Sequence, residues 1–186
     1  AVERLKNVIS NGAKCVIIAV YGNRAYEDAL VEMQDVATEI GFQVIAAIAG
    51  IAEHSICRMY ATGRPDDIDA KELASFGTTI LEKIKENKPF APLTLPGNRP
   101  YKQGCTGPFP TANDNCTDCG TCASQCPTGA ISIDNPKGNN NELCIGCMRC
   151  VSVCPVHARG IGERLNMLVE RLKPLCSDRK QNELFV

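Results

Sequence analysis

The chain carries the run Cys116-Thr-Asp-Cys119-Gly-Thr-Cys122-Ala-Ser-Gln-Cys126-Pro127 and repeats its pattern 28 residues later as Cys144-Ile-Gly-Cys147-Met-Arg-Cys150-Val-Ser-Val-Cys154-Pro155. The two runs hold eight of the twelve cysteines in a sequence of 186 residues. The apolar residues around them are few, chiefly Ile131, Ile133, Val151 and Val153. A segment this short and this poor in apolar side chains cannot build an ordinary hydrophobic core. We therefore expect bound metal to form the core of residues 111–158.

The spacing C-x-x-C-x-x-C-x-x-x-C-P is similar to the signature of bacterial-type ferredoxins with two [4Fe–4S] clusters, over about residues 112–158. In that family the three closely spaced cysteines hold one cluster, and the fourth cysteine ligates the partner cluster. The resemblance implies a small α+β ferredoxin-like domain that transfers electrons at low potential. It assigns the metal ligands as Cys116, Cys119, Cys122 and Cys154 for one cluster, and Cys144, Cys147, Cys150 and Cys126 for the other.

Structural zinc is the competing interpretation of these cysteines. A zinc site joins two C-x-x-C knuckles across a longer gap, because four ligands must surround one small ion. Four cysteines between Cys116 and Cys126, repeated once, do not suit that geometry. A thioredoxin-type redox pair would need only one C-x-x-C. The pattern favours iron–sulfur clusters, and Gly120 and Gly146 would let the backbone approach their sulfides.

Residues 1–88 alternate between strand and helix patterns. The apolar stretches 15–20 and 42–48 predict strands covered on both faces, and periodic apolar positions over 29–40 predict the helix between them. This order is typical of a parallel sheet in a doubly wound α/β domain. Only two strands are visible, which is too few for a stable sheet. We therefore expect that upstream residues complete the domain and that the natural N-terminus is missing.

A second helix is expected after a long loop that covers residues 49–68. Asp69 and Glu72 have the spacing of a capping box at its start. Farther on, residues 89–110 hold six of the eleven prolines and show no hydrophobic period. They predict a stiff linker that lies against a domain surface. Residues 159–186 predict a last amphipathic helix followed by a polar tail.

The loop after the first predicted strand reads Tyr21-Gly22-Asn23-Arg24-Ala25-Tyr26. It follows the carboxyl end of a strand, where doubly wound sheets bind ligands. Gly-Asn-Arg-Ala-Tyr-Glu resembles the second flavin-contacting loop of flavodoxins, which implies that Gly22 and Asn23 contact the edge of an FMN ring and that Tyr26 stacks on it. The candidate cofactor-binding residues are Tyr21, Gly22, Asn23, Arg24 and Tyr26.

Two departures and one alternative accompany this flavin prediction. Asn23 stands where the family has an acidic residue, and no Ser/Thr/Gly-rich phosphate loop occurs in the sequence. The alternative is that Tyr21 and Tyr26 are ordinary aromatic residues of a strand–helix loop.

The whole chain resembles the flavodoxin–ferredoxin fusion proteins of anaerobes. Besides the loop and the cysteine runs, the resemblance rests on Ala52-Glu-His-Ser55 and Gly63-Arg-Pro65. It implies a partial flavodoxin-like domain over 1–88, a linker over 89–110, a two-cluster ferredoxin domain over 111–158, and a C-terminal helix and tail over 159–186.

Three functions are compatible with this organisation. The first is an electron carrier that docks on redox partner proteins and exchanges electrons between its clusters and FMN. The second is an iron–sulfur flavoprotein reductase acting on a small molecule, and the third is a ferredoxin whose first domain only docks on partners. A formal charge of −1 gives no nucleic-acid footprint, and no apolar run reaches the roughly 20 residues of a membrane span. The resemblance implies the cytoplasm of an anaerobe.

Overall fold

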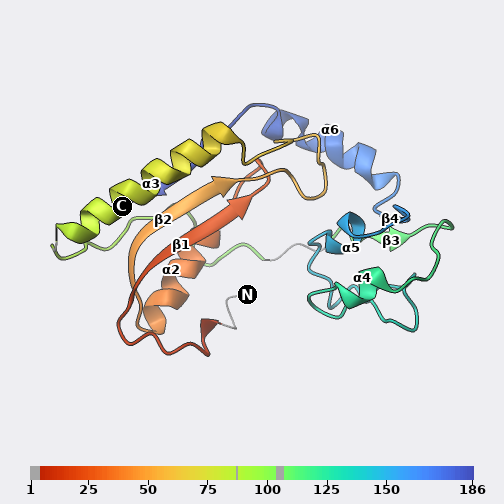
Figure 1. Cartoon of the computed structure of the whole chain (residues 1–186), viewed down its shortest axis with the longest axis horizontal. Helices are drawn as coiled ribbons and strands as arrows, with labels where there is room; N and C mark the ends of the chain where they lie inside the picture. The colour runs from red at the N-terminus through yellow and green to blue at the C-terminus, as the bar shows by residue number, and fades with distance from the viewer. Residues whose placement is uncertain (1–4, 87, 104–106) are drawn as a thin grey trace. The chain divides into compact units, whose positions relative to one another are not determined.

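The computed structural model describes residues 5–86, 88–103 and 107–186, and it divides the chain into two compact units (Figure 1). The first unit comprises Ala1–His54, Arg58–Lys102 and Pro174–Val186. The second comprises Ser55–Cys57 and Gln103–Lys173. The division differs from the predicted one at two places, because most of the proline-rich segment belongs to the first unit and the end of the chain returns to it.

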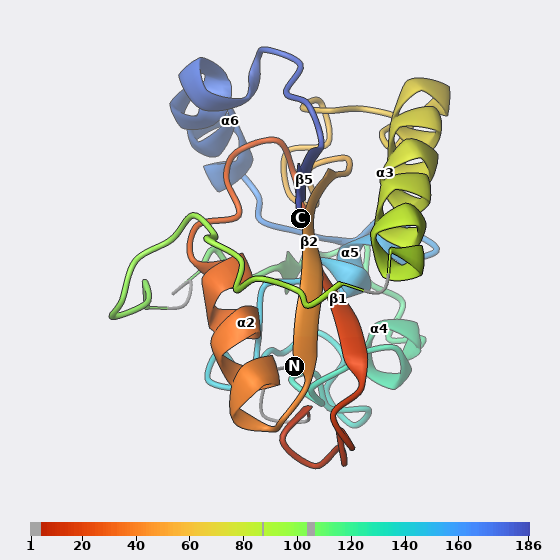
Figure 2. The ribbon, with the colours of Figure 1, turned by 90° about the vertical axis from the view of Figure 1, so that its left-hand side faces the viewer.

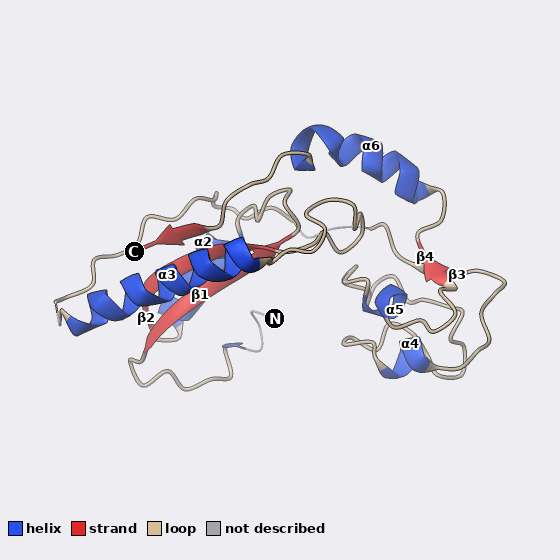
Figure 3. Ribbon diagram, turned by 45° about the horizontal axis from the view of Figure 1, so that its top comes forward, coloured by secondary structure: helices blue, strands red, loops and turns tan. Residues whose placement is uncertain are grey.

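The first unit is built on a βαβ motif. Strand β1 (Lys14–Tyr21), helix α2 (Ala29–Glu39) and strand β2 (Gln43–Ile51) follow one another in the chain. The two strands pair in parallel, with Ile17 opposite Ala47 in the register. The predicted strand–helix–strand unit is therefore confirmed (Figure 3).

A third strand comes from the other end of the chain. Strand β5 (Glu183–Phe185) pairs antiparallel with β2, which gives a mixed sheet in the order β1-β2-β5. Phe185 lies opposite Ala47, and Leu184 lies opposite Ile48. The sequence predicted only a polar tail here, because three residues are too few to show a strand period.

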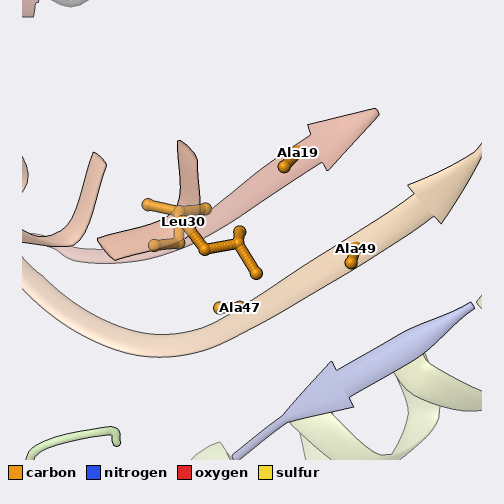
Figure 4. Packing of buried hydrophobic residues seen from close by; sticks show 5 residues of the cluster. Ala19, Leu30, Ala47 and Ala49 are labelled. Carbon is orange, nitrogen blue, oxygen red and sulfur yellow. The ribbon is translucent and has the colours of Figure 1, made fainter. Parts of the chain in front are cut away.

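Helices α2 and α3 (Asp67–Lys85) cover opposite faces of the sheet, as Figure 2 shows. On the α2 face, Leu30 is fully buried against three alanines of the strands, which are labelled in Figure 4: Ala19, Ala47 and Ala49. Their small side chains let the helix approach the sheet closely. On the opposite face, Ile80 of α3 packs against Ile45 and Ile48 of β2.

The prediction that both strands are covered on both faces is wrong for β1. Its outer residues Val16, Ile18 and Val20 are 36%, 53% and 68% exposed. Helix α3 packs on β2 rather than on β1. Within the described residues, one face and one edge of β1 therefore have no covering element.

Helix α3 begins three residues earlier than the sequence predicted. Its N-cap is Asp66, whose carboxylate accepts hydrogen bonds from the backbone N–H groups of Ile68 and Asp69. Asp69 completes the capping box by accepting from the Asp66 N–H at 2.9 Å. The predicted box of Asp69 and Glu72 is therefore wrong, because Glu72 instead accepts a hydrogen bond from Asn182 beside β5.

Residues 93–102 of the proline-rich segment pack on α2 and on its N-cap residue Asp28. The Leu93 carbonyl accepts a hydrogen bond from Gln34 at 2.9 Å. The carboxylate of Asp28 accepts bonds from the backbone N–H groups of Asn98 and Lys102, each at 2.7 Å. These bonds fix an extended, proline-rich chain against a domain surface, as predicted.

The second unit contains short elements around the cysteine runs. Helices α4 (Thr121–Ser124) and α5 (Arg149–Ser152) each carry the third cysteine of one run, and strands β3 (Thr111–Ala112) and β4 (Arg159–Gly160) pair antiparallel. Helix α6 (Arg164–Cys176) follows. Its residues from Pro174 onward belong to the first unit. Across the described ranges, no helix combines the length and the apolar character needed to cross a membrane.

Candidate metal centre

Each triplet of closely spaced cysteines is bent by two residues in the left-handed region. In the first run these are Asp118 and Gly120, with φ of 53° and 71°. In the second run the equivalent positions are Gly146 and Met148, with φ of 64° and 58°. The sequence pointed to the two glycines but missed Asp118 and Met148, since other residues seldom adopt positive φ. The resulting tight loops turn directly into α4 and α5.

The fourth cysteine of each run accepts hydrogen bonds from the backbone that follows it. The N–H of Ala130 donates to Cys126 Sγ at 3.3 Å, and the N–H of Ala158 donates to Cys154 Sγ at 3.2 Å. The residues two and five positions after each cysteine also donate backbone hydrogen bonds. The same four-residue turn is thus built in both repeats.

These backbone bonds favour the thiolate form of both fourth cysteines. Burial raises the pKa of the Cys126 thiol, but the donors at Thr128 and Ala130 outweigh it and leave that pKa below its usual value. Burial likewise raises the pKa of Cys154, and the N–H of Ala158 and its neighbours lower it overall. Thiolate is the form that binds metal.

The fourth cysteine of one run lies with the triplet of the other. A single pocket is lined by Cys126 together with Cys144, Cys147 and Cys150. In the other direction, Cys154 lies close enough to Cys119 for their charges to interact. The structure therefore brings together the four cysteines that the resemblance assigns to the second cluster, and it places Cys154 near Cys119 of the first run.

The third cysteines of the two runs share one small core. Cys122 and Cys150 are both buried and pack in one cluster with Ile131. Burial raises the pKa of the Cys150 thiol, while the guanidinium of Arg159 acts in the opposite direction. The hydroxyl of Thr121, 3.4 Å from Cys119 Sγ, helps to lower the pKa of that more exposed thiol.

Arg159 is a buried cation in this core that the sequence analysis did not single out. It is 3% exposed, and its guanidinium donates to the carbonyls of Pro110 and Gly138 at 3.4 and 3.2 Å and also to the carbonyl of Pro136. Its Nε, although buried, has no hydrogen-bond partner. A comparison of the two repeats could have found it, because Arg159 stands where the first repeat has the apolar Ile131.

The residues present suit an anionic iron–sulfur group. Eight sulfur donors in two sets match the thiolate ligation of [4Fe–4S] clusters. In the described part of the chain, Arg159 has no carboxylate partner, and a buried cation requires a compensating negative charge. Four thiolates outweigh the positive charge of an iron–sulfide core. Within the described residues, no three His, Cys, Asp or Glu side chains are grouped as one metal ion would require.

The five candidate flavin contacts lie together, but their polar groups serve the fold of the first unit. Asn23 is 2% exposed, and its amide donates to the carbonyls of Cys176 and Asp178 at 2.8 Å each. The Arg24 side chain pairs with Glu27. Asn23 therefore fixes the C-terminal segment rather than facing a ligand.

The tyrosines and the glycine of this loop are also engaged. The rings of Tyr21 and Tyr26 meet edge to face with centroids 5.2 Å apart. Burial and the neighbouring Glu183 carboxylate, which accepts a hydrogen bond from the phenol, raise the pKa of Tyr26 to about 12. A Cβ at Gly22 would lie 2.7 Å from the Cα of His54, so the glycine is needed for close packing.

One family matches part of the chain. Residues 115–159 match the 4Fe–4S dicluster domain family. No curated protein and no solved structure matches the chain. Residues 115–159 are therefore a 4Fe–4S dicluster domain, and the flavodoxin-like character of the first unit stays a prediction.

Proposed function

We propose, from the 4Fe–4S dicluster domain at residues 115–159, that this chain is an electron carrier that moves single electrons between redox partner proteins. When bound, a [4Fe–4S] cluster supplies a one-electron couple of low potential. An electron taken from a reduced donor protein is passed on to an oxidised acceptor protein, so the chain itself is unchanged after each transfer.

The protein's part is to hold two clusters close together and to shield them. In the proposal, one cluster is held by Cys116, Cys119, Cys122 and Cys154, and the other by Cys144, Cys147, Cys150 and Cys126. Because each fourth cysteine belongs to the opposite run, the two sites are interlocked and stay at short distance. The backbone N–H groups at Ala130 and Ala158 hold the crossed thiolates in place.

The observation that carries the proposal is the pocket lined by Cys126 and the second triplet. If each run bound its own cluster, Cys126 would face Cys116, Cys119 and Cys122 instead.

Pairs of cysteine variants test the crossed ligand sets. Protein prepared without oxygen should contain about eight irons per chain. Cys126→Ala combined with Cys144→Ala should remove ligands from one cluster only and leave one intact [4Fe–4S] cluster. Cys126→Ala combined with Cys116→Ala should leave none. Iron and sulfide analysis, with electron paramagnetic resonance of the reduced protein, measures both outcomes.

Cys15→Ala is the control, because Cys15 lies on β1 in the first unit and should not change the iron content. Zinc in place of iron, or about four irons in the unaltered chain, would refute the proposal. The opposite pattern in the two double variants would keep electron transfer but reject crossed ligation.

Participation of FMN, and with it the reductase alternative, is a finer hypothesis that rests on the flavodoxin resemblance. The buried amide of Asn23 and the paired rings of Tyr21 and Tyr26 do not favour it. We therefore leave FMN out of the proposed electron path. Acid treatment of the purified chain, followed by fluorescence, would detect a bound flavin. Its release would support the participation of FMN and the reductase alternative.

A further inference from the structure

The two repeats differ most sharply at one buried position. Ile131 lies five residues after Cys126, and Arg159 lies five residues after Cys154. Both side chains are buried, at 4% and 3% exposure. At this position of the first repeat, Ile131 makes apolar contacts. At the same position of the second repeat, Arg159 introduces a permanent positive charge.

The guanidinium of Arg159 contacts one cysteine from each run. Its Nη1 lies 3.7 Å from Cys122 Sγ. Cys150 lies close enough to the guanidinium for the two groups to interact electrostatically. Cys122 and Cys150 belong to different ligand sets and pack together in the core. Arg159 is thus the buried cation that both cluster sites share.

Carbonyl groups hold the guanidinium without cancelling its charge. Pro110, Pro136 and Gly138 accept its N–H bonds through their backbone oxygens. A carboxylate would neutralise the cation, but among the described residues none pairs with it. Charges act more strongly in a buried site than in water, because the local dielectric constant is low.

We propose that Arg159 is a positioning residue whose fixed charge, shared by Cys122 and Cys150, raises the reduction potentials of both clusters. The inference rests on the proposed function. Reduction adds negative charge to a site that already carries four thiolates, so a neighbouring cation stabilises the reduced state. Net charge and hydrogen bonds to sulfur are among the factors that set the potential of a cluster.

The test compares variants at this position by redox titration of the anaerobic full-length protein. Arg159→Met and Arg159→Gln remove the charge and keep a long side chain. At a fixed solution potential, the ratio of reduced to oxidised cluster should fall by about tenfold or more, which corresponds to a negative shift of about 59 mV or more. Both clusters should shift in the same direction.

Lys137→Gln is the matched control. It removes one positive charge from the same domain, but the Lys137 side chain is 51% exposed and pairs with Asp118 at the surface. Solvent and salt screen such a charge, so the control should shift the ratio much less than the Arg159 variants do. Equal shifts in the control and in Arg159→Gln, at full iron content, would overturn the inference.

Arg159→Lys covers the case in which the neutral variants fail to fold or to bind iron. This variant keeps the positive charge but loses the planar guanidinium group. The ratio of reduced to oxidised cluster should therefore stay near that of the unaltered protein. A tenfold fall in this variant would show that hydrogen-bond geometry and not charge sets the potential, and would reject the inference. Failure of the proposed function differs from both results, because the unaltered protein would then lack iron.

Discussion

At the scale of single residues, buried polar side chains do more than fill space in either unit. Arg64 is 7% exposed, and its Nε and Nη2 donate to the two oxygens of the fully buried carboxylate of Asp69. Asn182 donates to the same carboxylate at 3.0 Å. The Arg64 ion pair, with hydrogen bonds from Asp66 and Asn182, holds the pKa of Asp69 well below its usual range. This network joins the loop after β2, the start of α3 and the end of the chain.

Asp69→Asn should therefore lower the free energy of unfolding by about 3 kcal/mol, because it leaves the Arg64 cation buried without its partner. Urea unfolding at pH 7 measures the loss. Asp67→Asn, an exposed change in the same helical turn, is the control and should have little effect. Equal losses in the two variants would contradict a special role for Asp69.

The pH dependence of this difference follows from the lowered pKa. Asp69 is ionised more readily in the folded than in the unfolded chain, so it stabilises the fold fully above about pH 5. That contribution disappears as the pH falls through the folded-state pKa. The gap in stability between the unaltered chain and Asp69→Asn should narrow from pH 5 downward, whereas acid loss of the clusters affects both proteins alike.

At the scale of elements, β5 shows how three residues complete a sheet. Leu184 packs on the α3 face with Ile45, Ile48 and Ile80, whereas Phe185 packs on the α2 face. One short strand thus adds an apolar side chain to each face and covers the edge of β2. An open edge of that strand would otherwise offer unpaired backbone groups to other chains.

Leu184→Asp should cost roughly 1–3 kcal/mol of unfolding free energy, because it removes a half-buried leucine and places a charge against isoleucines. Val186→Asp, one position beyond the strand and 46% exposed, is the control and should cost little. Thermal unfolding followed by circular dichroism measures both. A loss at Val186 as large as at Leu184 would mean that β5 adds no packing.

At the scale of the whole molecule, the two units depend on different sources of stability. The first unit relies on aliphatic side chains between a sheet and two helices. The second has few buried apolar residues, and its core cluster contains two cysteines. Metal binding is therefore expected to stabilise the second unit far more than the first.

The open face of β1 has a consequence for the chain in solution. Val16, Ile18 and Val20 form an exposed apolar row on an edge strand, which favours association between chains. Ile18→Lys should reduce self-association at rising protein concentration, as measured by sedimentation velocity. Ile68→Lys, a change at another exposed isoleucine, on α3, is the control. Identical sedimentation of both variants and the unaltered chain would contradict the prediction.

Features that depend on neighbouring residues in the chain could be predicted from the amino-acid sequence. The cysteine spacing is local, so it predicted the dicluster domain, and the crossed sets of ligands followed from the resemblance. The βαβ unit followed from apolar periods over 15–20, 29–40 and 42–48. Gly120 and Gly146 were singled out because glycine lets the backbone approach a cluster closely, and both have positive φ in the structure.

Features that join residues far apart in the chain could be seen only in the folded molecule. The sequence predicted that Asn23 contacts a flavin. In the structure its amide donates a hydrogen bond to the carbonyl of Cys176, 153 positions away. Strand β5 exists because β2 offers an edge, and its own three residues carry no strand signal. Arg159 became visible as a shared cation only when folding buried it beside Cys122 and Cys150. Sequence patterns report local preference, whereas burial, charge partners and strand pairing arise from contacts that chain spacing does not encode.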